Sequence, residues 1–465
     1  MASRPIAAVV DEARQRFGAK AVITDPADLE PWLTDWRGRF HGKAEAILSP
    51  SSTEEVAAIV RLAAEHRVPL VPQGGNTSMA GGATPPPDGS ALILSLRRMN
   101  RLRSIDVGVA IAEAGMILAD LHGRAAQTGQ RFPLTLGARG SCTIGGLAAT
   151  NAGGTQVLKF GTMRSLVLGV EAVLPDGSIH DGLSGLTKDN RGYNLDQLLV
   201  GSEGTIGIIT AAALRLVPAV AARAVAWAGL SDPLRALELL RLMQARTDRV
   251  EGFEIVPGDC LDLVLQHIPG SRSPLGGRHA WHVLIEATSE AADRDPAELL
   301  QPLLAEALES GLIEDATLAA NEAQAEAFWH IRDSISEAER ASGATIAHDI
   351  SVRIADMPRF MTVTAAEVEA AFPGCKASGF GHLGDGNVHF HVRGDGVREH
   401  GPAITQMVYD LVTLAGGSIS AEHGIGQMKL EELERLGPPA KLHAIRAIKR
   451  ALDPLGLMNP GKLIR

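Results

Sequence analysis

The sequence predicts an α+β fold of two or three domains, and three observations lead to that prediction. The chain has 465 residues, which is more than one ordinary hydrophobic core accommodates. Its 50 glycines concentrate in the first half, in loops that follow short apolar strands. The second half alternates apolar stretches of strand length with amphipathic stretches of helix length. The hydrophobic fraction of 45% is typical of a chain that folds throughout.

A shift in composition divides the chain. Residues 1–40 are expected to form a mainly helical N-terminal segment, and 41–219 carry the glycine-rich loops. From residue 220 the composition moves towards alanine, leucine and charge, so 220–465 is expected to form a further domain. Its β-α-β-β-α rhythm predicts an antiparallel sheet with helices on one face. The expected strands and helices lie near residues 223–230, 232–246, 252–256, 281–287 and 291–310.

Charge and cysteine content exclude several function classes. The formal net charge of -10 argues against a nucleic acid as the main partner, although a local arginine or a metal could still bind an anionic substrate. Cys142, Cys260 and Cys375 form no CxxC pair, so we expect buried thiols in a reducing compartment. No stretch has the roughly 18 apolar residues of a spanning helix. Residues 1–18 lack the apolar core of a signal peptide, so a soluble, cytoplasmic protein is expected, with peripheral membrane attachment left open.

The loop at 72–82 is the first strong functional signal. Ser52 and Glu55 form a capping-box pattern at the start of a helix, and a strand at 68–71 follows that helix. The strand leads into a loop with four glycines, which lets backbone N–H groups approach an anion closely. The loop lacks the Gly-Lys-Ser/Thr of a Walker A motif, and it does not open a helix as GxGxxG does. A plain turn needs only one or two glycines, so a ligand-binding loop is favoured.

Two further stretches of small residues follow, at 132–154 and 201–210. The first is rich in glycine, alanine and threonine and carries little charge. The second opens a strand with glycines near its start, which indicates a close backbone approach. Such runs fit a chain that wraps around an extended, flat ligand.

Histidines and a glutamate in the second half indicate a metal site. His382 and His389 flank a Gly-Asp-Gly-Asn turn, so two short strands can bring their imidazoles together. Glu422, which precedes His423 in a second glycine-rich cluster, completes a His2Glu set with one coordination position left open. From the residues alone, a metal site and a pair of packed histidines are about equally favoured. Asp385 is an alternative ligand, but its place in the turn favours a turn role.

Motifs along most of the chain, taken together, resemble those of a known family. The segments are PQGGNTSMAGG, LGARGSCTIGGLAATNAGG, LGVEAVLPDG, KDNRGYNLDQLLVGSEGTIGIIT, GHLGDGNVHFHV, SAEHGIG and DPLGLMNPGK. In this order they are similar to the FAD-linked D-2-hydroxyacid dehydrogenases, a family of vanillyl-alcohol-oxidase-type flavoproteins. The resemblance runs from about residue 40 to the end, and Leu147 is a local departure where the family often has Asn.

The resemblance implies a fold and a cofactor. The fold is an FAD-binding domain of two α+β subdomains, followed by a C-terminal antiparallel-sheet domain for the substrate. No histidine near the glycine loops marks covalent attachment, so noncovalent FAD is expected. The residues expected to bind FAD are Pro72, Gln73, Gly74, Gly75, Asn76, Thr77, Ser78, Gly81, Gly82, Pro133, Leu136, Gly137, Ser141, Cys142, Thr143, Gly145, Gly146, Ala149, Thr150, Asn151, Gly153, Gly154, Glu203, Gly204, Ile208 and Asn459.

The reaction implied by the resemblance is oxidation of a D-2-hydroxy acid to the 2-oxo acid. D-2-hydroxyglutarate, D-lactate and D-malate are the substrate types, and hydride moves to flavin N5. His423 is then expected as the base that takes the hydroxyl proton. His382, His389 and Glu422 are expected to hold a divalent metal, zinc or manganese. Arg332, which by itself looks like a surface charge, becomes the clamp for the substrate carboxylate.

Other residues are expected to shape substrate binding beside His423. Ser336 lies four positions after Arg332 in one expected helix, 328–337, so the two share a face. His391 stands where the family often has Asn and is expected to contact the substrate. Ala347 replaces a lysine that is common in the family, which weakens the case for a second substrate carboxylate.

Two other functions stay open at this point. One is a flavin alcohol oxidase that needs no metal, and the other is a flavin-binding subunit of a glycolate-oxidase-like complex. The sequence has no NAD fingerprint, and the resemblance implies an electron-transfer flavoprotein or a quinone as electron acceptor. A homodimer is the default expectation for such an enzyme.

Overall fold

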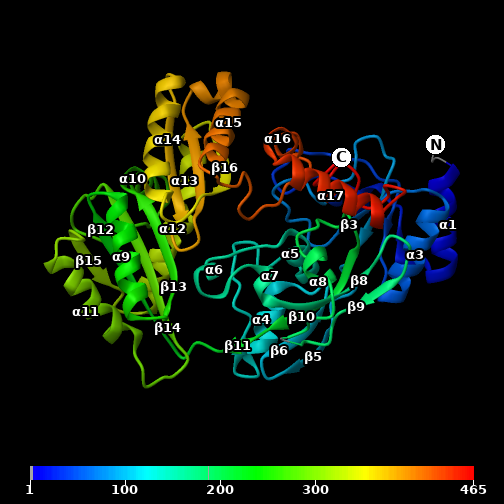
Figure 1. Ribbon diagram of the computed structural model, residues 1–465, viewed down its shortest axis with the longest axis horizontal. Coiled ribbons are helices and arrows are strands. Elements are labelled where there is room, and N and C mark those ends of the chain that lie inside the picture. The colour runs from blue at the N-terminus through cyan, green and yellow to red at the C-terminus, as the bar shows by residue number, and fades with distance from the viewer. Residues whose placement is uncertain (1–3, 187) are drawn as a thin grey trace. The chain divides into compact units, whose positions relative to one another are not determined.

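The computed structural model describes residues 4–186 and 188–465 (Figure 1). The chain divides into two compact units. The first contains the residues up to Gly154 together with Phe160–Pro218 and Glu422–Arg465, and the second contains Thr155–Lys159 and Ala219–Ala421. This division differs from a single boundary at residue 220, because the C-terminal segment returns to the first unit. Its return is fixed by backbone hydrogen bonds, in which Asn459 N donates to Leu70 O at 2.9 Å.

The first subdomain of unit 1 is built on a four-stranded sheet with the order β1-β2-β4-β3. Ser52 caps the N-terminus of α3 as expected, with Glu55 N donating to its Oγ at 3.2 Å. The strands before and after α3 both pair with β4 in parallel, so β4 lies between the two strands of the expected β-α-β unit. The elements are α1 (Arg4–Phe17), η1 (Ala19–Ala21), β1 (Val22–Ile23), α2 (Pro26–Leu29), η2 (Glu30–Trp32), β2 (Ile47–Leu48), α3 (Thr53–Glu65), β3 (Leu70–Gln73) and β4 (Leu92–Ser95).

The second subdomain of unit 1 is an antiparallel sheet with the order β5-β6-β10-β8-β9. Short helices pack against it around a core of small and branched residues. The elements are β5 (Leu102–Asp106), β6 (Val109–Glu113), α4 (Leu118–Ala126), β7 (Gln130–Arg131), α5 (Ile144–Thr150), α7 (Met163–Leu166), β8 (Val167–Val173), β9 (Ile179–Asp181), α8 (Leu195–Leu199), β10 (Ile208–Arg215) and β11 (Val217–Pro218). Helix α6 (Val157–Phe160) belongs to unit 2 except for its last residue. The C-terminal segment adds α16 (Leu430–Leu436) and α17 (Pro439–Leu452).

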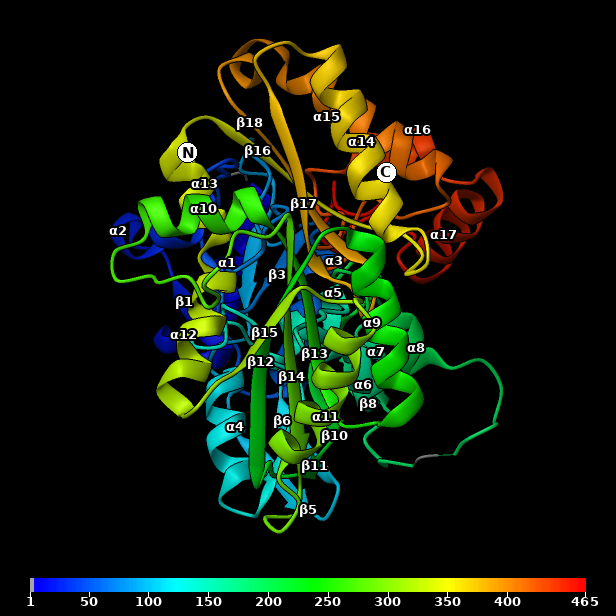
Figure 2. The same ribbon diagram turned by 90° about the vertical axis from the view of Figure 1, so that its left-hand side faces the viewer.

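Unit 2 is organised on a seven-stranded sheet with the order β15-β12-β14-β13-β17-β18-β16. Every pairing in it is antiparallel, which confirms the expected sheet type, and Figure 2 shows β12, β14 and β13 side by side. The strands are β12 (Ala222–Leu230), β13 (Val250–Pro257), β14 (Trp281–Ser289), β15 (Asp315–Leu318), β16 (Thr345–Ser351), β17 (Lys376–His382) and β18 (Asn387–Arg393).

Helices cover both faces of this sheet, so the expectation of helices on one face was wrong. On one face, α10, α12 and α13 pack over a core that includes Trp227, Phe328 and Phe380. The other face carries α9, α11, α14 and α15. Strand β13 is buried along its whole length, including Glu251 and Glu254, because it is an inner strand of a sheet that is covered on both faces. The helices are α9 (Pro233–Arg246), α10 (Gly258–His267), α11 (Pro296–Glu309), α12 (Glu322–Asp333), α13 (Ile335–Ser342), α14 (Met357–Ala371) and α15 (Gly396–Leu414).

The expected single helix at 328–337 is two helices. Ser334 ends α12, where its N–H donates to His330 O at 3.0 Å, and it also precedes the first residue of α13. Arg332 and Ser336 therefore lie in different helices, and their spacing of four positions does not define a shared helical face. Serine side chains compete locally with the helix for backbone hydrogen bonds, so a break at this residue is physically reasonable.

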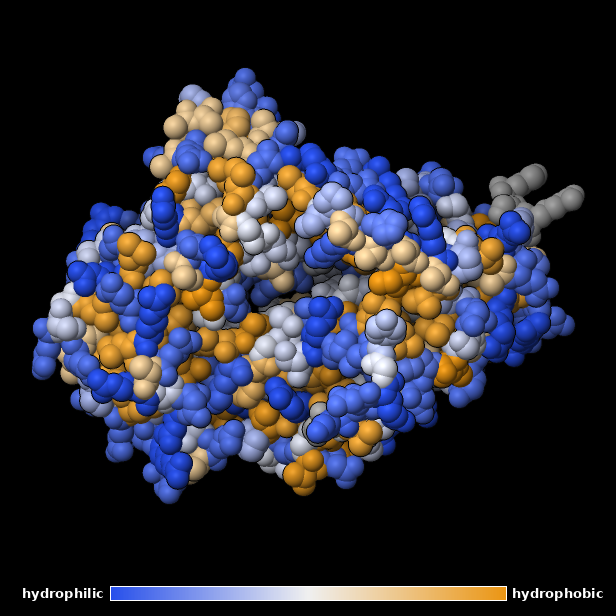
Figure 3. Space-filling view, in the orientation of Figure 1, coloured by the Kyte–Doolittle hydropathy of each residue, from blue (hydrophilic) through white to orange (hydrophobic). Residues whose placement is uncertain are grey.

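On the face shown in Figure 3, hydrophobic residues form several small groups among hydrophilic ones. Among the described helices, none combines the length and the apolar character needed to cross a bilayer.

Candidate functional site

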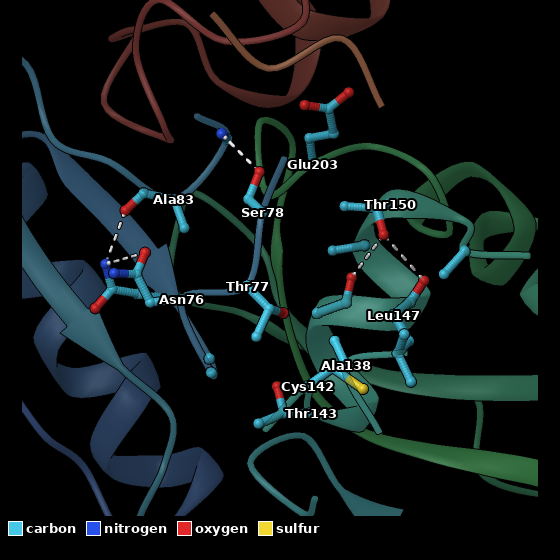
Figure 4. A pocket seen from close by; sticks show the side chains of 18 of the residues that line it. Asn76, Thr77, Ser78, Ala83, Ala138, Cys142, Thr143, Leu147, Thr150 and Glu203 are labelled. Atoms are coloured by element: carbon cyan, nitrogen blue, oxygen red, sulfur yellow. Dashed lines mark hydrogen bonds between the residues drawn. The ribbon is translucent and has the colours of Figure 1, made fainter. Parts of the chain in front are cut away.

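Unit 1 contains a cavity of about 580 Å³, a size typical of sites for small molecules and cofactors (Figure 4). Its wall combines the loop after β3, the segment before α5, α5 itself and the segment before β10. The residues expected to bind FAD all line it, apart from Gly81, Pro133, Asn151 and Gly154. Further lining residues that were not among the expected ones include Trp36, Met79, Leu96, Ala138, Leu147 and Ser202.

Two glycines in the first loop are required by close packing. A Cβ on Gly74 would lie 2.2 Å from Thr143 Oγ1, and a Cβ on Gly75 would lie 1.9 Å from Ser141 O. The loop after β3 therefore touches the segment before α5 through its backbone. Any side chain at these two positions would separate the two walls of the cavity.

Polar side chains in and next to the loop after β3 form hydrogen bonds that fix its conformation. Ser78 Oγ accepts the N–H of Gly82 at 3.0 Å (Figure 4). Asn76 takes a left-handed backbone conformation at φ 54° and donates Nδ2 to Thr34 O at 2.8 Å. Gln73 Nε2 donates to Trp32 O at 3.0 Å. These groups hold the loop open around the cavity.

Three other polar atoms fit a bound cofactor. Thr143 Oγ1, Ser202 Oγ and Asn459 Oδ1 are buried and have no hydrogen-bond partner among the described residues. All three residues line the cavity. Buried polar atoms are almost always satisfied in a folded protein, so three unsatisfied atoms in residues of one cavity wall are unusual. Together with the glycine packing, they fit FAD.

The four expected residues that do not line the cavity support its walls. Asn151 caps α5 in a left-handed conformation, and its Oδ1 accepts Arg164 N at 2.8 Å. Gly154 passes so close to Thr135 O that a Cβ would lie 2.3 Å from it. Gly81 has a positive φ of 68°, and its carbonyl accepts Gln427 Nε2 at 3.0 Å. Pro133 lies buried among the residues that follow β7.

Glu203 organises the C-terminal part of the cavity wall. Its carboxylate accepts Ile425 N and Gly426 N, each at 2.7 Å. Glu422 and His423 precede these residues and line the cavity. Burial raises the pKa of Glu203, while the two backbone donors and two lysine charges act against that shift.

In unit 2, His382 is the last residue of β17 and His389 is the third residue of β18, so the two flank the turn of one hairpin, as the sequence predicted. Their ring centroids are 5.5 Å apart and their planes meet at 75°. Asp385 takes a turn role, since its Oδ1 accepts Asn387 N at 2.9 Å. Burial lowers the pKa of His389 well below its usual value, and the positive charge of Arg332 adds to that effect. His389 is therefore neutral at pH 7, which is the form that binds metals.

Glu254 is the main residue that sequence reasoning missed. It lies on β13, is 1% exposed, and its Oε1 accepts from His382 Nδ1 at 2.6 Å. Its Oε2 accepts Arg332 Nε at 2.8 Å. Burial alone would raise the pKa of Glu254, but Arg332 and His382 hold it at about 2. The available signal was a carboxylate inside the otherwise apolar stretch 253–256.

His391 and Ser336 lie on the same side of the sheet as α13. His391 Nδ1 forms a hydrogen bond with the carboxylate of Glu339, which is fully buried on α13. Ser336, also on α13, is half-buried. Ala347 on β16 is the cross-strand neighbour of His391, so these two of the three departures from the family pattern stand directly opposite each other.

The sequence matches two known domain families, which together define the class of protein. Residues 220–463 match the C-terminal domain of FAD linked oxidases, and residues 44–182 match an FAD binding domain. The chain belongs to the FAD-linked oxidases.

Curated relatives narrow the class. The chain is 38% identical over 461 residues to the mitochondrial D-2-hydroxyglutarate dehydrogenase of Bos taurus, covering 97% of this chain and 82% of that protein. It is 35% identical over 459 residues to the D-2-hydroxyglutarate dehydrogenase of Xanthomonas citri pv. viticola, covering 97% of this chain and 95% of that protein. A putative mitochondrial D-lactate dehydrogenase of Schizosaccharomyces pombe is 33% identical, with coverage of 95% and 86%.

Solved structures support the fold assignment. A p-cresol methylhydroxylase superposes with a TM-score of 0.73 at 14% identity, covering 99% of this chain and 97% of that chain. An alkyldihydroxyacetonephosphate synthase superposes with a TM-score of 0.72 at 16% identity, covering 97% of this chain and 84% of that chain. At these identities the likeness concerns the fold alone.

Proposed function

We propose that the protein oxidises a D-2-hydroxy acid to the 2-oxo acid with FAD as the electron acceptor within the enzyme. The observation that carries the proposal is a cavity suited to FAD with His423 and Glu422 on its wall. D-2-hydroxyglutarate and D-lactate are the first substrates to test, because relatives carry those names. D-malate is the third. Bound FAD supplies the hydride acceptor at N5.

We propose that His382, His389 and Glu422 hold a divalent cation, zinc or manganese. The neutral state of His389 and the carboxylate beside His382 Nδ1 support this donor set, since metal-binding histidines commonly donate their second nitrogen to a carboxylate. A cation held there would polarise the hydroxyl oxygen and lower the pKa of the hydroxyl group.

The remaining roles belong to groups of the chain itself. His423 takes the hydroxyl proton, for which an imidazole is suited near neutral pH. Arg332 binds the substrate carboxylate through the Nη1–Nη2 end of its guanidinium, since Nε and Nη2 already lie along Oε2 of Glu254, each at 2.8 Å. Ser336 and His391 complete the substrate-binding set, with His391 held by Glu339.

The electron acceptor is proposed from the resemblance, the dimer as the default for such an enzyme, and the compartment from the cysteines. An electron-transfer flavoprotein or a quinone reoxidises the flavin, and two copies form a homodimer. The three cysteines are buried and unpaired, which supports a reducing compartment such as the cytoplasm.

Anaerobic flavin reduction tests the proposed function. The purified protein is mixed with the D and L forms of 2-hydroxyglutarate, lactate and malate, with added zinc, with added manganese or with a chelator. We expect D acids to bleach the oxidised-flavin absorbance and the chelator to slow that bleaching strongly. An equal rate of bleaching with and without the chelator would favour a metal-independent flavin oxidase. A flavin that no acid reduces would favour a non-catalytic flavin-binding subunit.

A further inference from the structure

The strand register of unit 2 places a carboxylate beside a proposed metal ligand. Glu254 on β13 and His382 on β17 are direct partners in the antiparallel pairing of these strands. Side chains of such partners lie on the same face of the sheet, with Cβ atoms about 5 Å apart. The contact between them therefore follows from the sheet itself and does not depend on a mobile loop.

The two oxygens of Glu254 are divided between two residues of the proposed site. Oε1 lies 2.6 Å from His382 Nδ1. Oε2 lies 2.8 Å from both Nε and Nη2 of Arg332, which reaches it from the last turn of α12. The side chains of Glu254, His382 and Arg332 are 1%, 8% and 11% exposed, so the three groups are fixed in a nearly dry environment.

This arrangement selects one tautomer of His382. A carboxylate paired with a guanidinium is ionised and can only accept hydrogen bonds. The proton of the neutral imidazole must then reside on Nδ1, and the lone pair lies on Nε2, where Arg332 Nη2 is 3.2 Å away and would have to give way to a cation. Nε2 is the atom through which this ring can bind a cation.

The same carboxylate orients Arg332. With the Nε edge of its guanidinium bound to Glu254, the group lies against the imidazole, with Nη2 3.2 Å from Nε2 and 3.5 Å from Nδ1 of His382. A carboxylate ligand can then bind only at the Nη1–Nη2 end of the guanidinium. Because the guanidinium group of arginine is planar and rigid, the residue that binds one edge of it also fixes the orientation of its other N–H groups.

We propose that Glu254 is a positioning residue that sets the metal-binding tautomer of His382 and the direction of Arg332 at the same time. This inference rests on the function proposed above. Glu254 touches neither substrate nor cofactor in this role and acts only through its two partners. Glutamine at this position would keep the shape, but its amide can either donate or accept, so it would no longer enforce one tautomer.

Glu286 provides a matched control. It lies on the neighbouring strand β14, on the same face of the sheet. It accepts from Trp329 Nε1 at 2.8 Å and pairs with Arg223 at 3.1 Å. Glu286→Gln therefore removes a partly buried, ion-paired carboxylate from the same sheet without contacting a proposed site residue.

The test compares Glu254→Gln, Glu254→Asp and Glu286→Gln with the wild-type protein loaded with FAD. Zinc affinity is measured by competition with a chelating dye, FAD content by absorbance, and KM and kcat for a D-2-hydroxy acid by flavin reduction. We expect Glu254→Gln to retain FAD, to lose zinc affinity by about tenfold to a hundredfold and to raise KM by about tenfold. Glu254→Asp keeps the charge, so its zinc affinity and KM should lie between those of the wild type and Glu254→Gln. Glu286→Gln should match the wild type in both.

A further variant separates positioning from folding. Glu254→Gln alone leaves the buried guanidinium without its counter-charge, which destabilises the fold. Removing the Arg332 charge beside Nε2 by itself favours zinc, so the reference for the double variant Glu254→Gln/Arg332→Gln is the single variant Arg332→Gln. The double variant must bind zinc more weakly than Arg332→Gln if Glu254 sets the tautomer. Equal zinc affinity in these two variants, or an equal loss in Glu286→Gln, overturns the role of Glu254. A wild-type protein that binds no zinc and is reduced by none of the acids overturns the proposed function as well.

Discussion

Gly426 donates its backbone N–H to Oε2 of Glu203 at 2.7 Å, which joins two positions 223 residues apart in the sequence. The second oxygen of Glu203 accepts the N–H of Ile425. A Cβ on Gly424 would lie 2.9 Å from Oε1, so the chain passes directly over this carboxylate. Glu203 thus fixes the backbone of the loop that carries Glu422 and His423 on the cavity wall of unit 1.

Replacing Glu203 by glutamine should displace this loop. The amide nitrogen would face a backbone N–H, so one donor loses its acceptor at a cost of about 1–3 kcal/mol. A shift of about 1 Å in a catalytic group can cost up to about a hundredfold in rate. We expect flavin reduction to slow by about tenfold to a hundredfold, as measured by stopped-flow absorbance. Glu171→Gln, which removes a carboxylate bonded to Arg103 and Thr53 elsewhere in the unit, should leave the rate near wild type.

His423→Ala should remove the proposed base without removing the cofactor. General base catalysis contributes about a hundredfold to ten-thousandfold, so flavin reduction should slow by that factor. FAD content, read from the absorbance of the purified protein, should not change. His122→Ala is the control, because His122 bonds to Leu134 O and does not line the cavity. Wild-type reduction kinetics in His423→Ala would exclude His423 as the base.

Gly75→Ala should prevent the first loop from closing on the segment before α5. Its Cβ would lie 1.9 Å from Ser141 O, a backbone atom that cannot move without moving the cavity wall. We expect the purified variant to contain little FAD and to bind added FAD at least tenfold more weakly. Gly123→Ala in α4 has open space around its Cβ and should bind FAD normally. Equal FAD content in both variants would refute the packing explanation.

His282 should make unit 2 less stable in acid. Burial lowers the pKa of His282 to about 4, and the nearby His279 adds to the shift, whereas the unfolded chain titrates near 6.5. Between these values the unfolded state binds more protons, so the free energy of unfolding falls as the pH decreases from about 6.5 to about 4. The contribution of this one group reaches about 3 kcal/mol.

The variant His282→Gln isolates that contribution. Glutamine does not titrate, and its carbonyl can still accept the Trp227 Nε1 hydrogen bond, which is 3.1 Å long in the wild type. Denaturant unfolding at pH 7 and at pH 4.5 should show a smaller loss of stability in the variant than in the wild type. Parallel losses in the two proteins would show that His282 is not the responsible group.

Several features could be predicted from local sequence because they depend on short spacings. The Gly-Asp-Gly-Asn turn predicted a hairpin that brings His382 and His389 together, and the structure has that hairpin. The capping box at Ser52 predicted the start of α3. In contrast, spacing alone suggested one helix through Arg332 and Ser336, whereas Ser334 separates two.

By itself, then, the sequence determined the α+β class, the antiparallel sheet, the glycine loops and the paired histidines. Only the tertiary structure decided that helices cover both faces of the sheet, that the C-terminal segment returns to the first unit, and which carboxylates serve the site. Glu254 meets Arg332 and His382 across 78 and 128 positions. Such contacts are set by strand register and by the packing of helices on a sheet, and periodicity within a short window contains no information about either.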